Sequence, residues 1–157
     1  SDRYYPFSSV ELFLSSENTL MINAPLVCDD TLQTNDIARI YPDGSFTILG
    51  RKDNVINSGG IKVQAEEIER LLQSSIPVPF VITSVPDRRL GQAVTLLIEG
   101  QMEISALGTK LESVLASYYR PKYIYTVNHI PQTGNGKINR KECRVLAESL
   151  QLLGRQE

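Results

Sequence analysis

The strongest constraint on the fold is a change in sequence periodicity close to Gly50. Before this residue, apolar and polar side chains alternate as in strands, in SSVELFLS, TLMINAPLV, DIARI and FTILG, without any helical period. Asn18 marks one expected turn, and YPDGSF marks another, where Pro42, Asp43 and Gly44 favour a tight reversal. The first fifty residues are therefore expected to form a small β meander, too small to be stable by itself.

After Gly50, strand patterns and helix patterns alternate. KDNVINSGGIKV predicts two short strands around a glycine turn, and VPFVITSV, QAVTLLIEG and KYIYTV predict further strands. Helical spacing occurs in AEEIERLLQSS, from residue 103 towards Pro121, and after Asn139, where Glu142 completes a capping-box pattern and Cys143 begins the buried face. HIPQTGNGKI is expected to be a loop or hairpin. The order predicts an α+β fold with a short β-hairpin, a three-stranded sheet and helices on one face.

Composition narrows the classes of function. With 157 residues and a formal net charge of −2, the chain lacks the basic surplus of a nucleic-acid-binding protein. Its apolar runs are too short for a membrane span, and its beginning does not resemble a signal peptide, which favours a cytoplasmic protein. Cys28, Cys143 and the single histidine, His129, have no metal-ligand spacing, so we expect reduced thiols and no metal site. Because the chain begins without Met, we expect it to be part of a longer protein.

Several residues in expected loops and strand ends could carry chemistry. Asp36 could accept hydrogen bonds from the vicinal hydroxyls of a sugar, and Arg51 could bind a phosphate. Gly59 and Gly60 could let a ligand approach the backbone, and Lys137 could carry a positive charge to an anion on the flexible TGNGK loop. Taken one at a time, a solvated acid, a surface charge, a hairpin turn and a solvated lysine are the commoner explanations.

Taken together, these segments resemble a known family. DIARI, DGSFTILGR, KDNVINSGGIKV, AEEIE and PQTGNGKINR follow one another as in the C-terminal part of the adenylate-forming acyl-CoA synthetase superfamily. That superfamily includes peptide-synthetase adenylation domains and firefly luciferase. Within it, FLSSENTLMINAPLV, TNDIARI and LGRKDNVINSGGIKV are most similar to the o-succinylbenzoate-CoA ligases of menaquinone synthesis. Two departures occur: TN precedes the acid where many relatives have TG, and the hinge segment reads RKDN where two acids are common.

The resemblance implies a domain organisation and an activity. Residues 1–50 would be the C-terminal β segment of a large N-terminal domain, residues 51–54 a hinge, and residues 55–157 a small C-terminal cap domain. Such enzymes join a carboxylic acid to ATP, release pyrophosphate, rotate the cap and pass the acyl group to a thiol, usually coenzyme A. ATP, coenzyme A and Mg²⁺ are thus the implied cofactors, with Mg²⁺ bound mainly by the N-terminal domain.

The resemblance also implies roles for single residues. Asp36 matches the acid that holds the ribose hydroxyls, and Arg51 matches an arginine that reaches the nucleotide. Asp53 matches the pivot of the rotation, and Lys137 matches the lysine that contacts carboxylate and phosphate oxygens during adenylation. The turn that would line the path of the coenzyme A pantetheine consists of Ser58, Gly59, Gly60 and Ile61.

Two alternatives of other classes remain open at this stage. One is a peptide-synthetase type of adenylation domain that loads a carrier protein, and the other is a non-catalytic interaction module. The chain has neither the Ser/Thr/Gly-rich phosphate loop nor the acyl pocket of the family, so we expect it to be inactive alone. Its expected partners are its own N-terminal domain, a carboxylic acid, ATP and coenzyme A, without nucleic acid or a membrane span.

Overall fold

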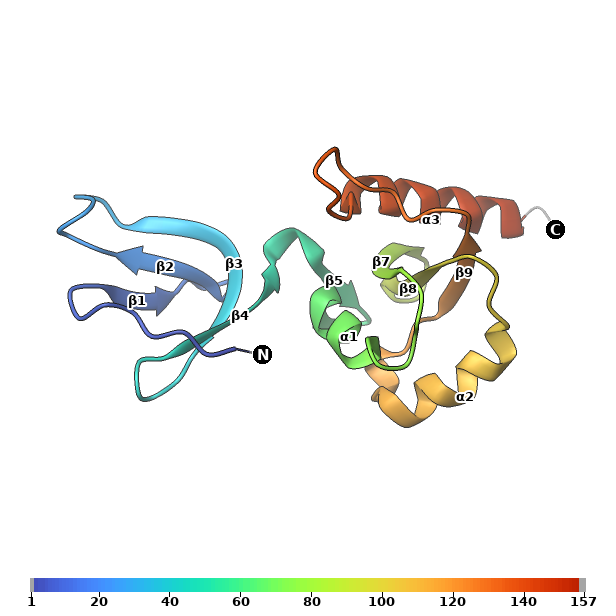
Figure 1. Ribbon diagram of the computed structural model, residues 1–157, viewed down its shortest axis with the longest axis horizontal. Coiled ribbons are helices and arrows are strands. Elements are labelled where there is room, and N and C mark those ends of the chain that lie inside the picture. Colours follow the sequence, from blue (N-terminus) through green and yellow to red (C-terminus); the bar gives the residue numbers. More distant parts are fainter. Residues whose placement is uncertain (1, 156–157) are drawn as a thin grey trace. The chain divides into compact units, whose positions relative to one another are not determined.

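The computed structural model describes residues 2–155, which divide into two compact units, one up to Val55 and one from Ile56 onward. The first unit is a four-stranded sheet in the order β1–β2–β3–β4 (Figure 1). Its strands are β1 (Glu11–Leu14), β2 (Thr19–Asn23), β3 (Leu32–Ile40) and β4 (Phe46–Arg51). Each strand pairs antiparallel with the next one in the chain, which confirms the expected meander.

Two turns of this unit use the residues that the sequence predicts. Asn18 precedes β2 with a φ of 64°, and Gly44 lies between β3 and β4 with a φ of 86°. The left-handed region is costly for most residues but accessible to asparagine and glycine. Asp43 stabilises the second turn, because its carboxylate accepts hydrogen bonds from the backbone N–H and the hydroxyl of Ser45.

The second unit combines a hairpin with a larger sheet. The strands run in the order β6–β5–β8–β7, and β9 pairs with β8 in parallel. Their bounds are β5 (Val55–Ser58), β6 (Ile61–Gln64), β7 (Phe80–Asp87), β8 (Gly91–Glu99) and β9 (Tyr123–Val127). The helices are α1 (Ala65–Leu72), α2 (Ile104–Val114) and α3 (Arg140–Arg155). The hairpin of β5 and β6 joins β8 at the Ser58–Gly91 pair, as expected for a hairpin beside a three-stranded sheet.

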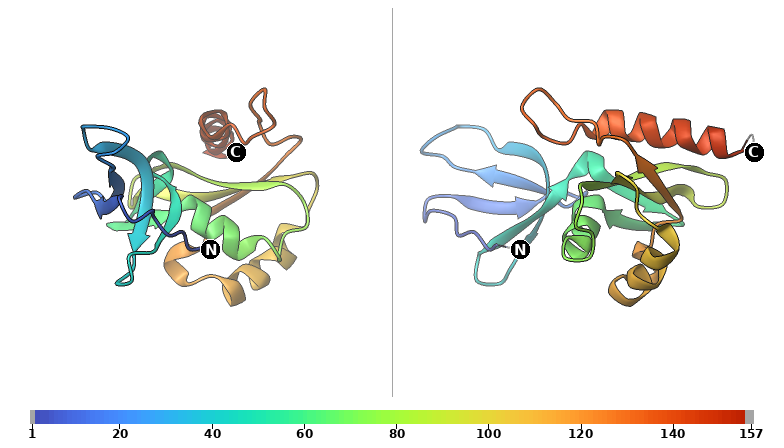
Figure 2. Two further views of the ribbon diagram at one scale, coloured as in Figure 1. Left: turned by 60° about the vertical axis from the view of Figure 1, so that its left-hand side comes forward. Right: turned by 45° about the vertical axis from the view of Figure 1, so that its right-hand side comes forward.

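Helices cover both faces of this sheet, so the expectation of helices on one face is wrong. Figure 2 shows α3 on one side of the strands and α1 and α2 on the other. The first core contains Ile68, Leu72, Leu107 and Leu111 from α1 and α2, together with Ile82, Val94, Leu96 and Ile98. The second contains Cys143 and Ala147 from α3, together with Val81, Val85, Ala93 and Leu97. The near-continuous apolar runs of β7 and β8 need cover on both faces, which a one-sided arrangement cannot give.

The ends of α2 and α3 test the helix predictions. α2 ends at Val114 rather than near Pro121, because Leu115 is already extended, with φ −110° and ψ 137°. The Arg120 guanidinium donates hydrogen bonds to the carbonyl oxygens of Leu115 and Glu112, both at 3.0 Å, and so satisfies the end of the helix. A 3₁₀ turn follows at Ser117–Tyr119.

The beginning of α3 agrees with the sequence. The Asn139 side-chain oxygen accepts a hydrogen bond from the backbone N–H of Glu142 at 3.1 Å, which confirms the predicted N-cap. Cys143 and Ala147 are completely buried on the predicted face of the helix, and Leu146 and Leu150 are partly buried beside them.

Candidate functional site

Asp36 and Arg51, the predicted nucleotide-binding pair, meet in the first unit. They are direct cross-strand partners on β3 and β4, and Arg51 Nη1 lies 2.8 Å from Asp36 Oδ1. Opposite residues of an antiparallel pair have close Cβ atoms, so this register places the two charges together. The Asp36 side chain is 29% exposed and that of Arg51 57%, and an ion pair this exposed contributes only about 0–1 kcal/mol to stability.

The surroundings of Asp36 fix its backbone. Its N–H donates to Thr34 Oγ1 at 3.2 Å, and the Thr34 hydroxyl donates to the Leu20 carbonyl oxygen at 2.8 Å. The register of β3 and β4 shifts between Ile37 and Ala38, an irregularity that changes the direction of side chains along a strand. A carboxylate offers about four acceptor positions, so Asp36 can bind Arg51 and still accept hydrogen bonds from hydroxyls of a ligand.

Asp53 lies in a short 3₁₀ turn, Lys52–Asn54, between β4 and β5. The turn buries none of its residues, and the division between the two compact units follows it at Val55. Lys52 Nζ lies 2.8 Å from Glu17 Oε2, and this hydrogen bond raises the pKa of Lys52. Lys52 is thereby tied to another residue of the first unit, three residues before the division at Val55.

The predicted glycine turn joins β5 to β6. Gly59 has a φ of 61° and Gly60 a φ of 84°, the combination that a two-residue type I′ hairpin requires. Gly59 also donates its N–H to the Leu90 carbonyl oxygen at 2.8 Å, and a Cβ there would lie 3.2 Å from Leu90 Cδ2. No atom lies within 4 Å of the position of a Cβ on Gly60. The turn is therefore fixed at Gly59 and open at Gly60, with the flanking Ile61 side chain exposed.

Asp87, the last residue of β7, supports this turn, and the sequence analysis missed it. Its Oδ1 accepts the N–H groups of Arg89 and Leu90, both at 2.9 Å, and its Oδ2 lies 2.6 Å from Lys122 Nζ. The hydrogen bond from Lys122, with those from the backbone, lowers the pKa of Asp87 to about 2. Since Leu90 holds Gly59, the Asp87 carboxylate stabilises the segment on which the glycine turn rests. The available signal was an aspartate close to the end of the expected strand VPFVITSV and shortly before Gly91.

Lys137 lies at the end of a loop closed by its own backbone. The Thr133 N–H donates to the Lys137 carbonyl oxygen at 2.7 Å, and the Gly136 N–H donates to the Thr133 carbonyl oxygen at 3.0 Å. Gly136 has a φ of 77°, and Gln132 and Ile138 form a β-bridge at the base. The loop is thus hairpin-like, one of the two predicted forms, and it presents an exposed lysine.

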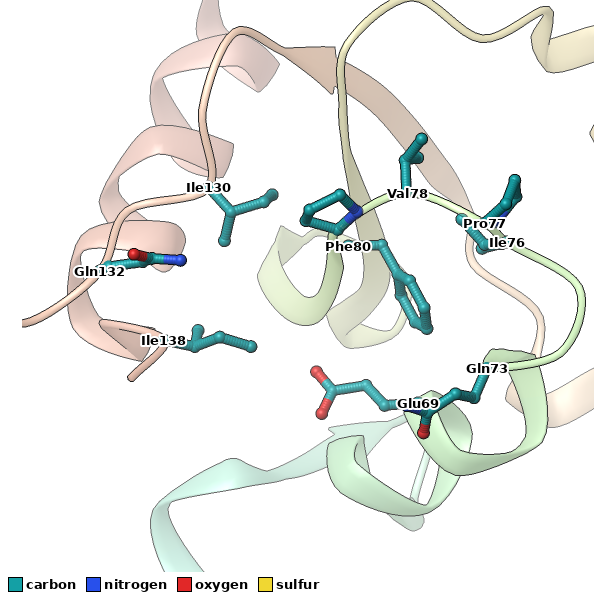
Figure 3. A pocket seen from close by; sticks show the side chains of 10 residues that line it. Glu69, Gln73, Ile76, Pro77, Val78, Phe80, Ile130, Gln132 and Ile138 are labelled. Carbon is teal, nitrogen blue, oxygen red and sulfur yellow. The ribbon is translucent and has the colours of Figure 1, made fainter. Parts of the chain in front are cut away.

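Beside the base of this loop lies an open cleft of about 450 Å³. Figure 3 shows its lining, which comes from α1, from the segment before β7 and from both sides of the loop base. The lining residues are Glu69, Gln73, Ile76, Pro77, Val78, Pro79, Phe80, Ile130, Gln132 and Ile138. None of the predicted site residues lines this cleft.

Other titratable groups offer little chemistry. Within residues 2–155, no three His, Cys, Asp or Glu side chains gather as metal ligands. The His129 side chain is 90% exposed. Cys28 and Cys143 are free, as expected, and burial raises the pKa of the Cys143 thiol to about 11, which makes it a poor nucleophile.

No helix in the described part of the chain has the length and apolar character needed to span a membrane.

The structure thus assembles the predicted residues into separate groups. Asp36 and Arg51 form one group in the first unit. In the second unit, the glycine turn forms another group and Lys137 lies on its own loop. Asp53 lies in the short turn near the end of the first unit. Asp87, Glu69 and Arg140 are the supporting residues that the sequence analysis did not identify.

Comparison with known proteins places the chain among larger ones. No family model matches it. It is 38% identical over 126 residues to triostin synthetase I of Streptomyces triostinicus, which covers 77% of this chain and 24% of that protein. It is 31% identical over 152 residues to the mitochondrial acyl-coenzyme A synthetase ACSM1 of Mus musculus, covering 90% and 26%. It is 33% identical over 113 residues to 2-succinylbenzoate–CoA ligase of Lactococcus lactis, covering 71% and 25%. The chain spans about a quarter of the length of these relatives.

Solved structures share the fold. The anthranilate CoA ligase AuaEII in complex with anthranoyl-AMP matches with a TM-score of 0.73 and 22% identity, over 94% of this chain and 35% of that one. A variant of E. coli MenE with bound OSB-AMS matches with a TM-score of 0.67 and 23% identity, over 93% and 35%. The α+β architecture therefore recurs as one part of larger proteins.

Proposed function

We propose a function from one premise: the chain belongs to the adenylate-forming acyl-CoA synthetase superfamily and corresponds to the C-terminal part of its members. The complete protein activates a carboxylic acid with ATP, giving an acyl-adenylate and pyrophosphate, and then transfers the acyl group to the thiol of coenzyme A. One observation carries this proposal. The two compact units divide after Val55, two residues beyond Asp53, and the first unit contains Asp36 and Arg51 whereas the second contains the glycine turn and Lys137.

In this proposal, residues 1–50 are the last β segment of a large N-terminal domain, residues 51–54 are the hinge, and residues 55–157 are the cap. The chain covers about a quarter of each relative and matches their C-terminal part, which supports a larger domain before it in the complete protein. The open 3₁₀ turn at Lys52–Asn54 supports the hinge, because hinges are short segments that absorb a change in backbone torsions.

For adenylation, the two units supply complementary groups. The Asp36 carboxylate accepts hydrogen bonds from the ribose hydroxyls, and the neighbouring Arg51 guanidinium orients that carboxylate and faces the nucleotide. Lys137 brings its ammonium to the carboxylate of the acid and to the α-phosphate, where negative charge is redistributed as pyrophosphate leaves. A preorganised positive charge stabilises such a transition state more strongly in a site that excludes water.

For thioester formation, the cap presents a different surface after rotation about Asp53. The turn of Ser58, Gly59, Gly60 and Ile61 then lines the path of the pantetheine arm. The open space at Gly60 supports this role, because a backbone without a Cβ permits close approach of a ligand chain. Two half-reactions with different chemistry benefit from two sets of groups at one site, and a hinge presents them in turn.

The cofactor requirements are divided between the domains. ATP and coenzyme A act as substrates, and the residues above would contact them. Residues 2–155 contain no cluster of metal ligands. In this proposal, Mg²⁺ would be held by the preceding domain together with the phosphates. The cytoplasmic location expected from the sequence is kept as part of this proposal.

The identity of the acyl substrate and of the acceptor thiol is a narrower proposal than the reaction class. We propose o-succinylbenzoate, in menaquinone synthesis, because 2-succinylbenzoate–CoA ligase of Lactococcus lactis is 33% identical to this chain. The 38% identity to triostin synthetase I, whose name is not that of a CoA ligase, favours a second candidate, an adenylation domain that loads a carrier protein. The two candidates share the adenylation step and differ in the thiol that accepts the acyl group.

A substrate panel on the complete protein tests both candidates. Pyrophosphate exchange with o-succinylbenzoate and other carboxylic acids identifies the acid, and thioester formation is then measured with coenzyme A and with a phosphopantetheinylated carrier protein. We expect exchange and thioester formation with coenzyme A. Exchange without transfer to coenzyme A would favour the carrier-protein candidate, whereas absence of exchange with every acid would leave an interaction module. The isolated chain should release no pyrophosphate from ATP.

A further inference from the structure

We propose that Glu69 and Arg140 are positioning residues that hold Lys137 in place for adenylation, a role that rests on the function proposed above. Arg140 Nη2 lies 2.7 Å from Glu69 Oε1, and Arg140 Nη1 donates to Glu69 Oε2 at 3.1 Å. The Glu69 side chain is 16% exposed and that of Arg140 28%. This two-point pair fixes the orientation of both side chains, unlike a pair of flexible surface charges.

The pair joins three elements of the second unit. Glu69 lies on α1, and its Oε2 also accepts the backbone N–H of Ile82 on β7 at 2.9 Å. β7 is an edge strand of the sheet, and its outward N–H groups need partners from outside the ladder. Arg140 is the first residue of α3 and follows Lys137 by three positions. One carboxylate therefore links α1 and β7 to the stem of the Lys137 loop.

The other stem of the loop is held by a similar contact. The Ile130 N–H donates to Glu99 Oε1 at 2.9 Å, and Glu99 is the last residue of β8. Across the base, the Asn139 N–H donates to the Pro131 carbonyl oxygen at 2.9 Å. In the tip, from Thr133 to Lys137, the Thr133 N–H bonds to the Lys137 carbonyl oxygen and the Gly136 N–H bonds to the Thr133 carbonyl oxygen, so both hydrogen bonds join residues of the tip to one another. The direction of the tip thus depends on how its two stems are attached.

The cleft beside the loop leaves one side of the loop base without packed neighbours, so the ion pair of Glu69 and Arg140 matters more for the position of the loop. Gln132 and Ile138, which form the base of the loop, face this cleft of about 450 Å³ together with Glu69 (Figure 3). On this side the base borders open space rather than packed side chains, so close packing cannot fix its position. The contacts of Arg140 with Glu69 supply a directional attachment there.

Loss of the pair should therefore affect one half-reaction. In the complete protein, Glu69→Gln retains an acceptor for Ile82 but leaves the Arg140 guanidinium without its carboxylate. We expect pyrophosphate exchange to fall about 10- to 100-fold, because a displacement of about 1 Å in a reacting group has effects of this size. Conversion of supplied acyl-adenylate and coenzyme A to thioester should be unchanged. Arg140→Lys, which keeps the charge but loses the fork, should give a smaller loss of exchange.

Gln151→Met is the matched control for stability. Gln151 is a buried residue of the same helix, α3, and its Nε2 donates to the Pro86 carbonyl oxygen at 2.8 Å. The substitution removes a buried hydrogen bond far along the helix from Arg140, so it lowers stability without altering the stem of the loop. It should leave the ratio of pyrophosphate exchange to thioester formation unchanged.

A double variant separates positioning from a purely structural contribution. If Glu69 acts through Lys137, adding Glu69→Gln to Lys137→Ala should cause no further loss of exchange. A further loss of about the same factor as in the single variant would overturn the proposal, and so would equal losses in both half-reactions of Glu69→Gln.

Hydrogen exchange provides a readout that does not depend on activity. In the complete protein, backbone amides of residues 132–139 should exchange faster in Glu69→Gln than in the wild type, and Gln151→Met should not change them. Unchanged exchange in this segment would overturn the positioning role. Absence of pyrophosphate exchange in the wild type would instead contradict the proposed function, and the amide measurement would still decide whether Glu69 holds the loop.

Discussion

Replacement of Lys137 by alanine probes the adenylation site most sharply. An ammonium about 4 Å from a phosphate oxygen, at an effective dielectric constant of about 20, contributes about 4 kcal/mol. The lysine side chain is exposed on its loop. Water that stays around its ammonium group after the cap closes therefore reduces this interaction energy. A loss of about 10²- to 10³-fold in adenylation is therefore expected, in the range observed when one electrostatic stabiliser is removed. The thioester half-reaction should be unchanged.

The structure also predicts that this variant folds normally. The loop is closed through the Lys137 carbonyl oxygen, which alanine retains, and exposed substitutions usually change stability by less than about 0.5 kcal/mol. Lys137→Arg should restore little activity, because a planar guanidinium does not replace a compact ammonium.

The assays are pyrophosphate exchange and thioester formation from supplied acyl-adenylate, both with the complete protein. Normal exchange by the folded alanine variant would refute the catalytic role of Lys137. Equal losses in the two assays would refute its restriction to adenylation.

Three further predictions concern the hinge, the glycine turn and Asp87 at the end of β7. Asp53→Pro should leave pyrophosphate exchange largely intact and impair thioester formation, since proline fixes φ; equal losses in a well-folded variant would remove Asp53 from the hinge. Gly59→Ala and Gly60→Ala should each lower the free energy of unfolding by about 1–2 kcal/mol, because both φ angles are positive, at 61° and 84°. Urea denaturation measures this effect, and unchanged stability would contradict it. The pKa of Asp87 is lowered from 3.8 to about 2, so its stabilisation is present above pH 3.8 and is lost as the pH falls through about 2. Asp87→Asn should therefore flatten the pH dependence of urea unfolding between these values, and an unchanged profile would contradict the role of its pair with Lys122.

The fold was largely predictable because its elements have clear local signals. The period of two before Gly50, the N-cap at Asn139 and the paired glycines of the β5–β6 turn all act within a few residues. The faces on which helices pack were less accessible, since strands β7 and β8 are apolar on both faces and do not indicate which helix covers which one. The early end of α2 depends on Arg120 folding back on the helix, a contact that helical periodicity does not encode.

The candidate site residues come from sequence motifs, and their roles stay predictions. Asp36, Arg51 and Lys137 were identified from their motifs, and the cross-strand contact of the first two depends on the register of β3 and β4. Glu69 and Arg140 lie in motifs that were recognised, but their contact joins residues 71 positions apart. The pairing of Asp87 with Lys122 is likewise a product of the tertiary fold, across 35 positions. A single sequence contains no signal for such partners.

The central claim is that one cap presents different groups for two half-reactions. Its most direct test is a single-turnover experiment with ATP, acid and coenzyme A, in which the acyl-adenylate and the thioester are measured together for Lys137→Ala and Asp53→Pro. We expect Asp53→Pro to accumulate acyl-adenylate and form thioester slowly, whereas Lys137→Ala should form little acyl-adenylate and yet convert supplied acyl-adenylate at the normal rate. If the two variants gave the same profile, with both steps slowed alike, the assignment of separate groups to separate half-reactions would be contradicted.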